Sequence, residues 1–282
     1  MTIEITAAEK AVLQGVTIPP RPEALLKISA EGKKEQPDMS IIAKAISEDV
    51  GISSSVLQVV NSAAFRRASE IQSIKQAVMT LGIKRLLPLV KSVALKSSMG
   101  ESDRLASFWD HASKIATVAS FAAEILEKPA FKDHAYMLGL FHNAGVPIMM
   151  LKYPDYDGVL ALAKTDGWQS VADLERQNYQ TTHTVVGALL GQKWNLPSVM
   201  SEVIYYQFDV DGLYESGELS STGLDLLTLL KLARYVVDCA VTGQTENAEW
   251  AQVEDAILSH YDITEDDVES YRDQLLDRLA EN

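Results

Sequence analysis

The sequence predicts an all-α protein made of two closely packed helical halves. Two observations predict this class: apolar residues recur with helical spacing along most of the chain, and alternating strand patterns are almost absent. Several segments also begin with a Ser or Thr followed three residues later by an acid, which is the capping-box pattern that starts a helix. We expect such starts at Thr6, Thr222 and Thr264.

In the N-terminal half, residues 1–100, the proline-rich segment TIPPRPEALLKI leads into the first strong helix. Two helices follow in SIIAKAISED and SSSVLQVVNSAAF, with Gly51 at their join. The next helix, KQAVMTLG, is expected to end at Gly82, because glycine favours helix ends, and IKRLLPLVKSVALKSS then begins another. The polar stretch MGESDR, residues 99–104, predicts the boundary between the halves.

The C-terminal half, residues 101–282, begins with a long helix that carries FWDHASKIATVASFAAEIL. The patterns that follow are helical to the end of the chain, where two acidic helices are expected. Between the long first helix and the two acidic helices, we expect helices in AYMLGLFHNAG, VADLERQN, THTVVGALLGQKW, VMSEVIYYQF and LDLLTLLKLARYVVDCAV.

Charge and composition argue against several classes of function. The formal net charge is -14, from 39 acids and 25 bases, and nucleic-acid binders instead cluster Lys and Arg. The single cysteine, Cys239, excludes an intrachain disulfide and is expected to be a buried small hydrophobe. The N-terminus lacks the apolar core of a signal peptide, and no apolar run reaches membrane-spanning length. We therefore expect a cytoplasmic protein that does not contact a membrane.

Three of the five histidines fall on apolar helix faces: His111, His142 and His183. A single inward histidine is more often a hydrogen-bonded core residue than a ligand. Three on separate helices indicate a shared cluster, which is how helical bundles build metal or proton-transfer sites. His134 and His260 have polar neighbours and are given no role.

The order of FWDH, GLFHNAG and HTVVGALLGQKWNLP resembles the HD superfamily of metal-dependent phosphohydrolases. The resemblance is closer to its HDOD branch, which occurs in bacterial signalling proteins. IPPRPEALLKI, AKAISEDVGISSSVLQVVNSAAF and IKQAVMTLGIKRLLPLV are similar to that branch's proline motif, NSA helix and LG helix. The resemblance covers about residues 16–210 and implies a multi-helical HDOD-like bundle, while the rest resembles only the superfamily's later helices.

HD hydrolases bind metal through a first His, a His-Asp doublet and a later Asp, and some branches add histidines. The resemblance matches the first His to His111 and the doublet to His142 and Asn143. Where related sequences carry two further histidines this chain has Gln207 and Phe208, and where the superfamily places the later Asp it has Arg234.

These departures replace charged or basic ligands with neutral amides and add a permanent cation, which predicts a degenerate metal site. The residues expected to line this pocket are His111, His142, Asn143, His183, Gln207 and Arg234.

The resemblance implies a non-catalytic signal-transduction module that binds a partner protein or a small ligand at this pocket. No cofactor is expected, although residual Zn, Fe, Mn or Ni could occupy His111, His142 and His183. The alternative is a metal-dependent phosphohydrolase that acts on a nucleotide or cyclic dinucleotide, with Asn143 as a weak ligand. Neither the partner nor the oligomeric state follows from the sequence.

A third hypothesis is DNA-binding regulation through residues 41–61, which have the outline of a helix-turn-helix. A DNA-reading helix exposes basic or amide side chains, whereas this one offers mainly serines and follows the acids Glu48 and Asp49. We therefore expect a helical hairpin packed in the core, and no nucleic acid as partner. The resemblance implies that Asn61 is a buried amide that ties neighbouring backbone groups together.

Overall fold

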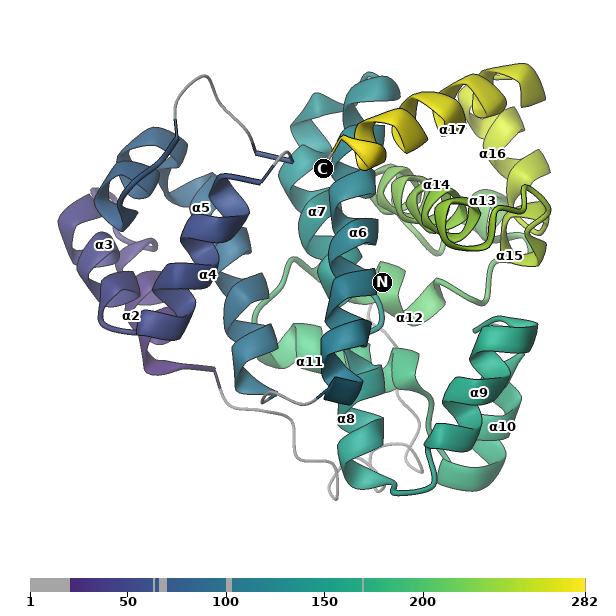
Figure 1. Ribbon diagram of the computed structural model, residues 1–282, viewed down its shortest axis with the longest axis horizontal. Coiled ribbons are helices and arrows are strands. Elements are labelled where there is room, and N and C mark those ends of the chain that lie inside the picture. The colour runs from purple at the N-terminus through teal and green to yellow at the C-terminus, as the bar shows by residue number, and fades with distance from the viewer. Residues whose placement is uncertain (1–20, 63, 66–69, 100–102, 169, 282) are drawn as a thin grey trace. The chain divides into compact units, whose positions relative to one another are not determined.

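Every described element of the computed structural model is a helix, so the all-α prediction is confirmed for these residues (Figure 1). The structure describes residues 21–281 apart from 63, 66–69, 100–102 and 169. Among these helices, none combines the length and the apolar character needed to cross a membrane.

The described residues fall into two compact units. Those up to Asp110 form one unit, and those from His111 to Glu281 form the other. The division lies inside one helix, α6 (Asp103–Ile125). The boundary predicted within residues 99–104 stays a prediction, because residues 100–102 lie outside the described part of the chain.

The first unit is a group of helices around a central long one, α5, which packs against the other three. In chain order they are α2 (Glu23–Glu31), α3 (Met39–Ser47), α4 (Val50–Val60) and α5 (Ile74–Ser98). The side chain of Asp49 caps α4 by accepting the Ile52 N–H, so Gly51 lies inside this helix and not at the join. Val56 and Val60 of α4 are fully buried, and the hairpin of α3 and α4 packs in the core as expected.

Asn61 follows α4 and ties two backbone segments together. Its side-chain nitrogen donates to the Ile71 carbonyl at 2.8 Å, and its side-chain oxygen accepts the Ile71 N–H at 2.9 Å. This is the tying role that the resemblance implied, although Asn61 is half-buried. Gly82 interrupts α5 with φ 69° and ψ 165°, a conformation that glycine adopts without strain. The helix end predicted at Gly82 therefore corresponds to a real break.

The second unit holds the remaining helices. After α6 they are η1 (Pro129–Phe131), α7 (Lys132–Phe141), α8 (Gly145–Lys152), α9 (Asp157–Asp166), α10 (Val171–Tyr179), α11 (His183–Lys193), α12 (Ser198–Tyr206), α13 (Leu213–Ser216), α14 (Ser221–Thr242), α15 (Ala248–Ala251), α16 (Glu254–Tyr261) and α17 (Glu265–Ala280). Helix α14 is the centre of this unit, because it is buried along most of its length and packs against α7, α12, α15 and α17. It thereby becomes the scaffold for the site described below.

The predicted capping boxes have different outcomes. The one at Thr264 is confirmed, since its hydroxyl and the Asp267 carboxylate satisfy each other's backbone N–H groups. The one at Thr222 is wrong, because Ser220 caps α14 by accepting the Gly223 N–H. Asp225 is instead buried, where it accepts the Tyr261 hydroxyl and pairs with a lysine. The one at Thr6 lies outside the described residues.

Candidate functional site

His142 lies at the end of α7, where the chain turns into α8, and only 2% of it is exposed. Its ring Nδ1 lies 2.6 Å from the Gly139 carbonyl oxygen, which can only accept, so Nδ1 carries the proton and donates. The other ring nitrogen, Nε2, is buried without a hydrogen-bond partner among the described residues. His142 therefore presents a free lone pair to the interior.

The surroundings of His142 disfavour positive charge. Burial lowers the pKa of His142 well below its ordinary 6.5, and the nearby Arg234 and His111 lower it further. The Gly139 carbonyl and Glu249 oppose this only in part. The imidazole is consequently neutral at physiological pH, and the environment that keeps it neutral also disfavours an added cation.

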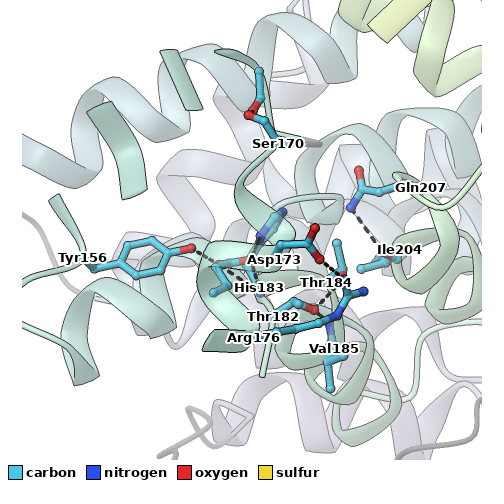
Figure 2. Close-up of polar contacts among 12 residues, drawn as sticks. Tyr156, Ser170, Asp173, Arg176, Thr182, His183, Thr184, Val185, Ile204 and Gln207 are labelled. Atoms are coloured by element: carbon cyan, nitrogen blue, oxygen red, sulfur yellow. Dashed lines mark hydrogen bonds and ion pairs between the residues drawn. The ribbon is translucent and has the colours of Figure 1, made fainter. Parts of the chain in front are cut away.

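His183, the first residue of α11, is held by a buried carboxylate. Its Nδ1 lies 2.8 Å from Oε2 of Glu175, and its backbone N–H donates to both oxygens of Glu175 at 3.2 Å. The Tyr156 hydroxyl also donates to Glu175, and in Figure 2 it points towards the start of α11, where His183 lies. These contacts leave Nε2 of His183 buried without a described partner. A carboxylate that orients an imidazole in this way is typical of metal-binding and proton-transferring histidines.

Replacing Glu175 with glutamine is expected to lower the free energy of unfolding by about 1–3 kcal/mol, because the amide cannot accept all the donors that converge on the carboxylate. The substitution should also allow the neutral imidazole of His183 to adopt the tautomer with its proton on Nε2, because Glu175 no longer holds the proton on Nδ1. Chemical denaturation measures the stability, and nitrogen NMR of the imidazole measures the tautomer. The control is Asp173→Asn on the same helix, whose side chain is 84% exposed and which should leave both unchanged. Unchanged stability and tautomer in Glu175→Gln would contradict the role assigned to this carboxylate.

Gln207 joins the end of α12 to the end of α7. Its side-chain nitrogen donates to the His142 carbonyl at 2.6 Å and to the Ile204 carbonyl at 3.2 Å, the second of which is drawn in Figure 2. Because carbonyl oxygens accept only, these bonds fix the amide orientation and leave Oε1 as an acceptor. Four of the predicted pocket residues therefore carry a buried acceptor atom without a described partner: His142 Nε2, Asn143 Oδ1, His183 Nε2 and Gln207 Oε1.

Arg234 is buried on α14 and forms an ion pair across the unit with α15. Its Nε and Nη2 donate to the two carboxylate oxygens of Glu249 at 2.8 and 2.6 Å, and Nζ of Lys231 donates to the same carboxylate at 2.8 Å. Burial by itself would raise the pKa of Glu249, but Arg234 and Lys231 outweigh it and lower the pKa to about 2. This buried network of Lys231, Arg234 and Glu249 is called the ion-pair cluster below.

An aromatic ring connects the ion-pair cluster to the histidines. Phe208 lies under both cations, with Lys231 Nζ 5.0 Å and Arg234 Cζ 5.1 Å from its ring centroid. The centroid of the same ring lies 5.6 Å from that of the His183 imidazole, which lies 4.8 Å from a ring of Trp168. The ring of Phe208, two residues beyond the end of α12, therefore lies against both the cations of α14 and the first residue of α11.

The structure brings the six predicted residues into one region. Gln207 bonds to His142, and Asn143 follows it in the chain; Arg234 reaches His183 through Phe208. Half-exposed His111 belongs to the same electrostatic neighbourhood, because it contributes to the lowered pKa of His142. Glu175, Lys231 and Glu249 were not predicted from the sequence. Only Lys231 carried a signal, since it lies one helical turn before Arg234.

The residues present do not fit a hydrolytic metal centre of the HD type. Across the described part of the chain, no three His, Cys, Asp or Glu side chains are grouped so that they could hold a metal ion. Asn143 and Gln207 supply only neutral oxygens, and Arg234 places a permanent cation near His142. Arg234 makes its hydrogen bonds to Glu249 and none to Asn143 among the described contacts.

Comparisons with known proteins agree with this arrangement of helices. A family model of the HDOD domain matches residues 18–210. An uncharacterized protein from Treponema pallidum (strain Nichols) is 27% identical over 196 residues, which is 68% of this chain. The match spans 38% of that relative's own length.

Solved structures with this fold have low sequence identity to the chain. A candidate phosphohydrolase from Shewanella amazonensis has a TM-score of 0.72 at 20% identity, over 98% of each chain. An HDOD domain protein from Geobacter sulfurreducens has a TM-score of 0.59 at 19% identity, over 95% of this chain and 97% of its own. A candidate signal transduction protein from Marinobacter aquaeolei has a TM-score of 0.65 at 19% identity, over 98% of this chain and 60% of its own. At such identities the likeness establishes the fold alone.

Proposed function

Because the chain belongs to the HDOD domain family, we propose that it is a non-catalytic signal-transduction module that binds a small ligand or a partner protein at its degenerate HD site. The observation that carries the proposal is the ion-pair cluster. Two buried cations, Lys231 and Arg234, lie over the Phe208 ring that contacts His183, and Arg234 also lowers the pKa of His142. A hydrolytic centre would instead need anionic ligands around a divalent ion.

Electrostatics support a role without a metal. A divalent ion at His142 would be repelled by Arg234, and repulsion between charges in a buried region is only weakly screened. Neither Asn143 nor Gln207 supplies the negative charge that would offset this repulsion.

The unpartnered acceptors support ligand binding. A buried acceptor without a partner carries the free-energy cost of its lost hydration, and a ligand or bound water that donates to it removes that cost. His142, Asn143, His183 and Gln207 each present such an atom. The region is therefore suited to a ligand that brings hydrogen-bond donors.

Protein purified without a nickel column is expected to contain far less than one equivalent of Fe, Mn, Zn or Ni, because the site opposes a cation. It should also release no nitrophenol from bis(p-nitrophenyl) phosphate when Mn²⁺ is added. Metal analysis by mass spectrometry and a colorimetric assay measure the two quantities. Stoichiometric metal that is lost in His142→Ala, but retained in the control His134→Ala on the same helix, would contradict the proposal.

The second candidate is a metal-dependent phosphohydrolase that acts on a nucleotide or cyclic dinucleotide. One observation favours it: His142 and His183 are both fixed with the proton on Nδ1, which leaves Nε2 free as a metal ligand. In this alternative His142 and His183 would hold the ion, which would activate water or polarise a phosphoryl oxygen. The metal analysis described above distinguishes the two candidates.

A further inference from the structure

We propose that Lys231 and Arg234 form a binding site for the phosphoryl group of a small ligand, and that the chain's own Glu249 occupies this site until the ligand displaces it. The inference rests on the proposed function, because it names the class of ligand that the module would bind. Glu249 then acts as an internal competitor for the site.

The geometry around Glu249 is that of an oxyanion site. Arg234 presents Nε and Nη2 to the two carboxylate oxygens at 2.8 and 2.6 Å, the paired arrangement that Arg offers equally to carboxylates and phosphates. Lys231 adds a third donor at 2.8 Å from above the Phe208 ring. A carboxylate has two oxygens for these donors, whereas a phosphoryl group has three.

The charges also fit a dianion better than a carboxylate. Glu249 supplies one negative charge to two buried cations. Another carboxyl group in the neighbourhood, Asp238, accepts from the side-chain nitrogen of Asn247 at 3.0 Å and forms no ion pair with either cation among the described residues. Burial lowers the pKa of Lys231, although the carboxylate of Glu249 acts to raise it. A phosphoryl group, with a charge of about -1.5 to -2 at pH 7, would neutralise both cations.

Glu249 lies on a different helix from the two cations, so it can move away while they keep their positions. It belongs to α15, a four-residue helix that follows the exposed residues 241–246, and 14% of its side chain is exposed. Lys231 and Arg234 belong instead to the long central helix α14. The ring of Trp250, beside Glu249, stacks on Tyr235 at 5.1 Å and would report a movement of α15.

The test is a titration of the wild-type chain with inorganic phosphate and pyrophosphate, in the presence of a chelator and at constant ionic strength. Calorimetry measures the affinity, and tryptophan fluorescence measures the movement of α15. We expect saturable binding with a fluorescence change that disappears in Trp250→Phe. Glu249→Gln removes the internal competitor and should bind phosphate at least about tenfold more tightly than the wild type. Glu246→Gln, an exposed acid three residues earlier, is the matched control and should bind as the wild type does.

Two results would overturn the inference. One is the absence of saturable binding of both anions to the wild-type chain up to about 10 mM, which corresponds to a negligible affinity. The other is binding to Glu249→Gln with wild-type affinity, which would place the anion elsewhere. The wild-type titration stands by itself if Glu249→Gln does not fold. Failure of anion binding in a metal-free protein overturns this inference alone, whereas stoichiometric metal overturns the proposed function.

Discussion

Replacing Glu249 with glutamine is expected to lower the free energy of unfolding by about 3–5 kcal/mol, because removing one partner of a buried ion pair leaves the other partners charged and uncompensated. Here the effect falls on two cations at once, since Lys231 and Arg234 both pair with this carboxylate. Both are largely buried, with 1% and 8% of their side chains exposed, so water cannot take over the role of Glu249. Urea denaturation followed by circular dichroism at pH 7 measures the change.

Acid provides an independent measurement of the same ion-pair cluster. The pKa of Glu249 is about 2 in the folded protein and 4.5 as a reference, so its stabilisation is fully present above about pH 4.5 and is lost as the pH falls towards 2. This part of the acid dependence should be missing in Glu249→Gln and retained in Glu246→Gln. A Glu249→Gln variant within about 1 kcal/mol of the wild type would show that the two cations find other partners.

The histidine faces were predictable because helical periodicity and the family motifs both refer to local sequence. His142 and His183 carry their signal within a few residues, in GLFHNAG and HTVVGALLGQKW. What these signals could not give is the atom on each ring that stays free. That depends on the Gly139 carbonyl for His142 and on Glu175, from a different helix, for His183.

The partners of Arg234 were beyond sequence reasoning for a related reason. The resemblance pointed to position 234 as a departure from an acid, and the structure places this arginine close to His142. Its carboxylate partner, however, comes from α15, beyond an exposed stretch whose path periodicity does not specify. The error at Thr222 has the same origin, because Asp225 is drawn into contacts with Tyr261 and not into a local cap. Local patterns locate elements, whereas long-range pairing decides what a polar residue does.

Replacing Gly145 with alanine is expected to lower the free energy of unfolding by about 3 kcal/mol or more, because the new methyl group would overlap backbone atoms. A Cβ at this position would lie 1.9 Å from the His183 carbonyl oxygen and 2.8 Å from the backbone nitrogen of Gly187. Both atoms belong to α11, and a helix backbone cannot rotate aside as a flexible side chain can. The first turn of α8 must therefore move away from α11, and thermal and urea denaturation measure the loss.

The control for Gly145→Ala is Gly158→Ala on the exposed side of α9, where a Cβ meets nothing within 4 Å. Alanine is the better helix former, so this variant should be as stable as the wild type or up to about 1 kcal/mol more stable. Equal stabilities of the two variants would contradict the close packing of α8 on α11. Gly145 follows Asn143 by two residues and would press on the carbonyl of His183, so its replacement should also separate the acceptors of His142 and His183. A ligand that needs both acceptors should then bind more weakly to any Gly145→Ala protein that still folds, because the fixed backbone approach is what holds the two histidines together.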